Sequence, residues 1–105
     1  MLAGFVFNPI GAHTSDTSLG TAKTVTRPTG ATCLRIQALA QAVRYTLDGT
    51  TPTASLGFKL AVGVETYIET PTSVAVKVIE ETASGEIQYQ WGVMIPIAGN
   101  RPARS

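Results

Sequence analysis

The sequence predicts an all-β fold: a single β-sandwich or jelly-roll-like domain with extended N- and C-terminal arms. From residue 31 onward, apolar and polar residues alternate with a period of two, which is typical of strands that bury one face. Turn-forming residues interrupt the alternation at intervals that suit a sandwich. Threonine, alanine, glycine and valine are abundant while leucine, lysine and glutamate are scarce, a balance that favours strands and turns over helices.

Five runs carry this alternation, and in each run the residues of one face are spaced two residues apart. These residues are Leu34, Ile36 and Ala38; Val43, Tyr45 and Leu47; Val64, Thr66 and Ile68; Val74, Val76 and Val78; and Ile87, Tyr89, Trp91 and Val93. The breaks are DGTTPT, the step at Gly63, TPTS and ASGE. The stretch LRIQALAQAV has some helix propensity, but its first half alternates. We therefore predict two strands that meet near Ala40 and Gln41.

Both ends of the chain differ from this central part. Residues 1–30 are rich in Thr, Ser, Gly and Pro and contain too few apolar residues for a core of their own. We expect an extended N-terminal arm over residues 1–30, a sandwich over 31–95 and a C-terminal tail over 96–105. An edge strand at AKTVTR is the alternative for part of the arm, and Pro96 and Pro102 disfavour a regular ladder in the tail.

Length and charge exclude several classes of function. A chain of 105 residues forms one domain by default and buries roughly 65% of its unfolded surface. Eight basic and seven acidic residues give a net charge of +1 with no charged run, so we expect no nucleic-acid partner. No apolar run approaches the ~20 residues of a membrane span, and the N-terminus lacks the pattern of a secretion signal. Cys33 is the one cysteine, which fits a reducing compartment.

The stretch VRYTLDGTTPTASLGF (residues 43–58) predicts a structural corner formed by Asp48, Gly49, Thr50, Pro52 and Gly57. Asp48 can accept hydrogen bonds from amides two residues onward, Gly49 adopts positive φ without strain, and Pro52 sets φ for a second turn. The alternatives are a calcium loop or a sugar-binding turn. Calcium needs several oxygen ligands, and this segment has only one carboxylate.

Candidate catalytic and metal-binding residues are few, and we expect no enzyme, no cofactor and no metal. His13 is the only histidine, and it has too few neighbouring donors for a transition-metal site. A nucleophilic pair of Cys33 with His13 is formally possible, but Cys33 begins an alternating strand. Glu80, Glu81 and Glu86 flank a turn, where solubilising carboxylates are commoner than the catalytic pair of a glycosidase.

The aromatic residues allow two interpretations. Tyr89 and Trp91 share a strand face with Ile87 and are expected to form the largest part of the core, although an exposed sugar-stacking stripe is the alternative. Phe5 and Phe7 lie two residues apart and point the same way if the chain is extended there. They either anchor the arm in a partner or cover the chain's own core.

Residues 43–69, VRYTLDGTTPTASLGFKLAVGVETYIE, together with SVAVKVIEETASGEIQYQWG, resemble small proteins of tailed bacteriophages and prophages. The shared features are an Arg-Tyr strand, a DGT-x-PT-A corner, a Gly-aromatic step, a Val-rich strand and an aromatic final strand. The resemblance covers Val43 to Gly92, close to half of the chain. The corner alone is also similar to a turn in β-sandwich modules appended to bacterial glycosidases.

The phage resemblance implies a structural protein of the virion, with a capsid decoration (cement) protein as the leading expectation. Such proteins bind where capsomers meet, and extended termini commonly fasten neighbouring subunits. The expected partners are the major capsid protein, other virion proteins and further copies of this chain, assembled in the host cytoplasm, with no membrane partner. Expected partner contacts are Phe5, Phe7, Pro9, Ile10, Ile97 and Arg101. A head-to-tail connector, a tail component and a carbohydrate-binding module are the alternatives.

Overall fold

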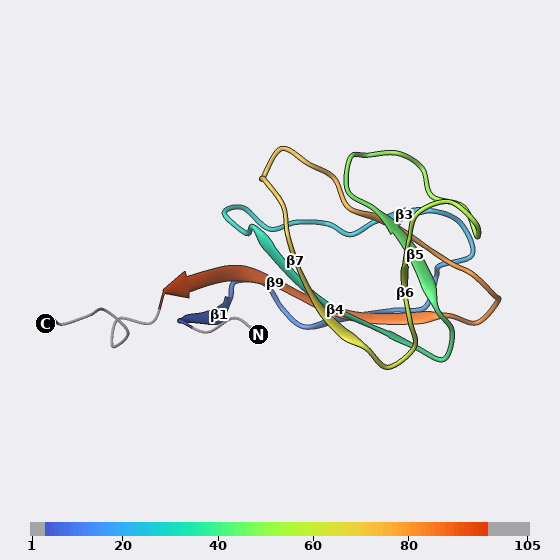
Figure 1. Cartoon of the computed structure of the whole chain (residues 1–105), viewed down its shortest axis with the longest axis horizontal. Coiled ribbons are helices and arrows are strands. Elements are labelled where there is room, and N and C mark those ends of the chain that lie inside the picture. Colours follow the sequence, from blue (N-terminus) through green and yellow to red (C-terminus); the bar gives the residue numbers. More distant parts are fainter. Residues whose placement is uncertain (1–3, 97–105) are drawn as a thin grey trace, which may run out of the picture.

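The computed structural model describes residues 4–96 and shows two antiparallel sheets packed face to face, as Figure 1 shows. Sheet A has the order β1-β9-β4-β7, with β2 also paired to β9, and sheet B has the order β3-β8-β5-β6. The strands are β1 (Phe5–Pro9), β2 (Thr14–Asp16), β3 (Lys23–Thr24), β4 (Cys33–Leu39), β5 (Val43–Thr46), β6 (Phe58–Leu60), β7 (Glu65–Glu69), β8 (Lys77–Glu80) and β9 (Glu86–Pro96). The predicted all-β sandwich is confirmed. Residues 4–96 contain no helix able to cross a membrane.

The core lies between the sheets and is built mainly from the alternating residues. In the register of β4 and β9, Leu34 lies opposite Trp91 and Ile36 opposite Tyr89, so these side chains share the inner face of sheet A. Sheet B contributes buried valines and a leucine: Val43, Val78 and Leu60, with Val76 just before β8. Trp91 is only 2% exposed, so the predicted core role is confirmed and Trp91 cannot serve as a sugar platform.

The predicted junction of two strands near Ala40 is confirmed. β4 ends at Leu39 and β5 begins at Val43. Between them Ala40 has a φ of 69°, and the amide of Gln41 donates to the carbonyl of Leu39 over 2.8 Å. This tight three-residue turn reverses the chain, and because β4 lies in sheet A and β5 in sheet B, it also passes the chain from one sheet to the other.

The N-terminal boundary at residue 30 is wrong, because most of residues 10–30 belong to the sandwich. β2 pairs with β9, and β3 pairs with β8 as the predicted edge strand. Leu19 is completely buried and Val25 nearly so, both within the core. Isolated apolar residues in a polar segment cannot form a core of their own, but they complete a core that the rest of the chain provides. The tail boundary also moves, since Pro96 is still paired in β9.

Within residues 4–96, β1 and the end of β9 project together from the sandwich. β1 pairs with the last five residues of β9, from Phe5 opposite Pro96 to Pro9 opposite Gly92. We call β1 and residues 92–96 the terminal ribbon. Figure 1 shows it extending beyond the body of the sandwich at one end of the molecule. Residues 10–13 separate it from β2 as a bulge in which the amides of Ile10 and Gly11 both donate to the carbonyl of Trp91.

Candidate functional site

The terminal ribbon exposes large apolar side chains on both of its faces. Phe5 is 47% exposed on one face, and Val6 is 52% exposed on the other, beside the exposed Ile95 opposite it in the register. Ile10 is also exposed at the base of the ribbon. Residues 4–12 and 92–96 contain no charged side chain. Exposed apolar surface of this kind marks an interaction site or an aggregation site.

Gly92 lets the two strands of the ribbon lie close together. A Cβ on Gly92 would lie 2.8 Å from Cζ of Phe7 and 2.9 Å from Cα of Pro9, both inside normal contact distance, and it would also clash with the carbonyl of Asn8. Gly92 is not among the residues predicted from the sequence. The available signal was a glycine in the middle of an otherwise alternating strand, which often marks a close backbone approach.

Phe7 fastens the base of the ribbon to the outer face of sheet A. Its ring packs edge-on against Tyr67 on β7, with centroids 5.7 Å apart. The guanidinium of Arg35 lies 5.4 Å from the Tyr67 centroid and 5.9 Å from that of Phe7. Arg35 also donates to Glu65 over 2.5 Å, and this hydrogen bond raises the pKa of Arg35. Phe7 is therefore partly buried, while Phe5 is free to contact another molecule.

The structure brings four of the six expected partner contacts together. Phe5, Phe7 and Pro9 lie on β1, and Ile10 follows directly. Ile97 and Arg101 lie outside the described residues. Within residues 4–96, the residues proposed as partner contacts thus lie on one continuous stretch of chain, β1 and the residue after it.

The corner lies at the opposite end of the molecule from the ribbon, in green in Figure 1. The amide of Thr50 donates to Oδ1 of Asp48 over 3.0 Å, and hydrogen bonds from Thr50 lower the pKa of Asp48. Gly49 has a φ of 84°. The hydroxyl of Thr46 donates to the carbonyl of Thr50, and Pro52 is fully buried. These contacts are the local bonding expected of a structural corner, and they hold its backbone in one conformation.

Gly57 lets the end of the corner lie directly against the backbone of β5. Its φ is 129°, and a Cβ there would lie 3.0 Å from the carbonyl oxygen of Tyr45. Its own carbonyl accepts a hydrogen bond from Arg44. Beside it, Leu56 and Phe58 border an apolar hollow of about 520 Å³, with Phe58 63% exposed. This hollow was not predicted, because the sequence pattern did not show that Phe58 lies on an exposed edge strand.

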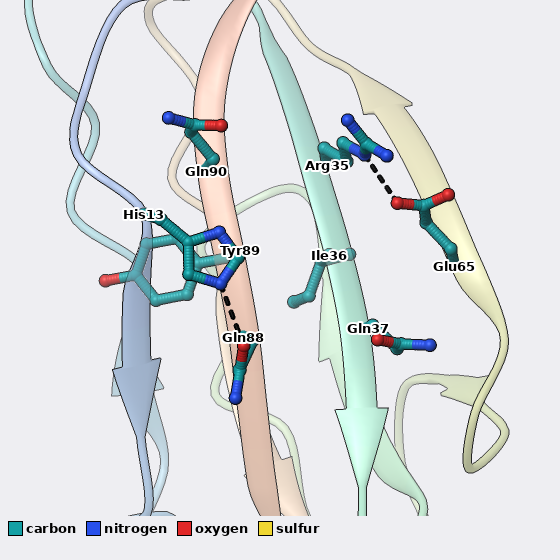
Figure 2. Close-up of a pocket in the computed structure, with 8 residues that line it drawn as sticks. All are labelled: His13, Arg35, Ile36, Gln37, Glu65, Gln88, Tyr89 and Gln90. Atoms are coloured by element: carbon teal, nitrogen blue, oxygen red, sulfur yellow. Dashed lines mark hydrogen bonds and ion pairs between the residues drawn. The ribbon is translucent and has the colours of Figure 1, made fainter.

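A polar groove of about 300 Å³ crosses the outer face of sheet A (Figure 2). Its polar lining residues come from four segments of the chain: His13, Arg35, Gln37, Glu65, Gln88 and Gln90. The Nε2–H of His13 donates to Oε1 of Gln88 over 2.8 Å. We call this feature the outer-face groove. Of these residues, only His13 was considered as a candidate from sequence, because the others meet only through the strand register.

The described residues do not assemble the catalytic or metal sites considered above. Cys33 is completely buried, and burial, with a smaller effect of the Glu69 charge, raises its pKa to about 11, which disfavours a reactive thiolate. Within residues 4–96, no three of the side chains of His, Cys, Asp and Glu are grouped to hold a metal ion.

The three glutamates near the 81–85 turn are held by other groups of the protein. Glu80 accepts a hydrogen bond from the amide of Gly85, and Glu86 accepts one from the hydroxyl of Ser15. Glu81 pairs with Arg44 over 2.5 Å. Each carboxylate therefore has a structural contact, and the geometry offers no specific support for a glycosidase pair.

Comparison with known proteins yields no relative: no family model matches the chain, and no curated protein or solved structure is significantly similar to it.

Proposed function

We propose that this chain is a structural protein of a tailed-bacteriophage virion, a capsid decoration protein that attaches to neighbouring capsid subunits through its terminal ribbon. The observation that carries the proposal is the ribbon itself. It projects from the sandwich, has no charged residue, and exposes Phe5, Val6 and Ile95. The resemblance of residues 43–92 to small phage proteins supplies the virion as the setting.

The outer edge of β1 strengthens this argument. β1 pairs with β9 on one side, and the sheet order places no described strand on the other side. Proteins usually protect such an edge with charged residues or coverage, but β1 has only Pro9 at its end. An edge of this kind can accept a strand from a partner, with alternate side chains providing specificity.

Attachment through the ribbon becomes stronger when many copies act together. Apolar burial contributes about 25 cal/mol per Å², and the exposed parts of Phe5, Val6 and Ile95 are available for it. Multivalent contacts between a decoration protein and a shell add avidity beyond the affinity of one copy. We expect the major capsid protein as the partner and an oligomer of this chain in the assembled state.

The test is attachment to particles. Capsids of the phage that encodes the chain are purified without it, mixed with the protein and sedimented. A triple variant, Phe5→Thr, Val6→Thr and Ile95→Thr, keeps strand propensity but removes the apolar surface of the ribbon, so we expect bound protein to fall at least about tenfold. The matched control is Val62→Thr with Val64→Thr, two exposed valines of the sandwich, which we expect to bind normally.

Equal binding of the triple variant and the wild-type protein would contradict attachment through the ribbon. Absence of the protein from purified virions, measured by mass spectrometry, would contradict the virion assignment. Localisation by electron cryomicroscopy distinguishes a capsid position from a connector or tail position. The connector and the tail are the alternative positions in the virion at which the same ribbon could make its contact.

A further inference from the structure

The outer-face groove is formed by side chains that the strand register places next to one another. On β9 and β4, Gln90 lies opposite Arg35 and Gln88 opposite Gln37. On β7, Glu65 lies opposite Gln37. His13 approaches from the segment before β2. Figure 2 shows His13 and the two β9 glutamines on one side of the groove, with Arg35, Gln37 and Glu65 on the other.

The hydrogen bonds of these side chains fix them and leave polar atoms available. The amide nitrogen of Gln37 donates to the carbonyl of Gly63, and that of Gln90 donates to the carbonyl of Gly11. Arg35 uses its Nε to bind Glu65. Within residues 4–96, no hydrogen bond engages the Oε1 atoms of Gln37 and Gln90 or the Nη atoms of Arg35. The groove therefore presents acceptors and donors that are already positioned, which reduces the entropic cost of binding.

The charges of the lining residues indicate which class of ligand the groove can bind. Two lining residues, Arg35 and Glu65, carry opposite charges. The Nε atom of Arg35 lies 2.5 Å from Oε2 of Glu65, so the two charges neutralise each other. An anion or a cation thus gains little net Coulomb attraction in the groove. An apolar ligand would bury polar atoms without partners, which is unfavourable. Hydroxyl groups both donate and accept, so they match a surface that offers both functions.

An aromatic ring lies beside these polar groups. Tyr67 lies opposite Arg35 in the register, on the same outer face, and it stays 38% exposed beside the contacts that its ring makes with Phe7 and Arg35. Aromatic rings provide flat apolar contact next to hydrogen-bonding groups. We propose that the outer-face groove binds an uncharged glycan, with the free amide oxygens and the Arg35 guanidinium bonding its hydroxyl groups and Tyr67 contacting a ring at the edge.

The probes are uncharged hexasaccharides of glucose, galactose, mannose and N-acetylglucosamine, titrated into the full chain to about 10 mM and followed by amide NMR shifts. We expect at least one of them to shift the resonances of Gln37, Gln88 and Gln90. In the double variant Gln37→Ala with Gln90→Ala, we expect affinity to fall at least about tenfold, because two hydroxyl partners are lost. Gln41→Ala, a glutamine at the β4–β5 turn outside the groove, should bind as the wild type does.

Three results would overturn this inference: no shift with any of the uncharged probes, shifts that map to another surface, or binding limited to an anionic control, hexagalacturonate. A circular dichroism melt confirms that each variant is folded. The outcome is separable from the proposed function, because the glutamine variants should still sediment with capsids and the ribbon variant should still bind the sugar.

Discussion

Arg27 shows how one side chain joins three parts of the sandwich. Its guanidinium donates to the carbonyl of Ala31 over 2.9 Å, to the hydroxyl of Thr70 over 2.7 Å and to the carbonyl of Val74 over 2.6 Å. It also lies 4.4 Å from the centroid of the Trp91 ring. Burial lowers the pKa of Arg27. The residue therefore connects the segment after β3 with the β7–β8 connection and the core.

We expect Arg27→Met to lower the free energy of unfolding by about 2–4 kcal/mol, because several buried acceptors lose a charged donor. Arg27→Lys should be intermediate, since a single ammonium cannot reproduce the planar fork of donors. Urea unfolding followed by Trp91 fluorescence measures both. Equal stability of the Met variant and the wild-type protein would show that Arg27 is not a structural connector.

Asp16 gives the sandwich a predictable sensitivity to acid. Burial alone would raise the pKa of Asp16, but Lys23 at 2.6 Å and the amide of Ser18 outweigh it, so the pKa lies below the ordinary 3.8. A lowered folded-state pKa stabilises the protein fully above the unfolded-state pKa, and this stabilisation is lost as the pH falls through the folded-state value.

In Asp16→Asn, the free energy of unfolding should therefore fall less between about pH 5 and pH 2 than in the wild-type protein. At neutral pH the variant should be less stable by about 0.5–1 kcal/mol. Denaturant unfolding at several pH values measures the difference. If the wild-type and Asn curves run parallel across this range, Asp16 does not contribute to the acid sensitivity.

At the scale of the elements, the ribbon depends on a glycine. We expect Gly92→Ala to separate β1 from β9, because the added Cβ meets Phe7 and the backbone of β1. Hydrogen exchange of the amides in residues 5–8 should accelerate at least about tenfold, while the core amides stay protected. Gly20→Ala is the matched control, since its nearest neighbour would be a Glu80 side-chain oxygen at an ordinary 3.7 Å.

Unchanged exchange in residues 5–8 of Gly92→Ala would mean that β1 tolerates the added methyl and that close approach is not required. Faster exchange throughout the sandwich would instead assign Gly92 to the stability of the whole fold.

Local periodicity predicted most strands but not their partners. The split at Ala40 was predictable because the alternation on both sides of it is clear. The places of Leu19 and Val25 in the core were not, because a single apolar residue in a Thr-rich segment leaves no periodic signal. The outer-face groove depends on the register of β4 with β7 and β9, which only the folded chain defines.

At the scale of the whole molecule, the boundary between the ribbon and the body predicts two different deletions. Removing residues 1–9 takes away β1 and should leave the sandwich folded. Removing residues 1–20 also takes away β2 and the completely buried Leu19, so we expect a loss of about 3–5 kcal/mol. Thermal unfolding of both proteins checks this. Similar stability of the two would place Leu19 outside the cooperative core.

The corner and the ribbon occupy opposite ends of the sandwich. Residues 53–55 at the corner are exposed, and the backbone on either side is tied together by the paired amides and carbonyls of Thr53 and Leu56. A foreign peptide inserted there would be presented to the surrounding medium far from the terminal ribbon. If copies cover a shell through their ribbons, the same geometry makes this chain a ready carrier for a dense array of displayed epitopes.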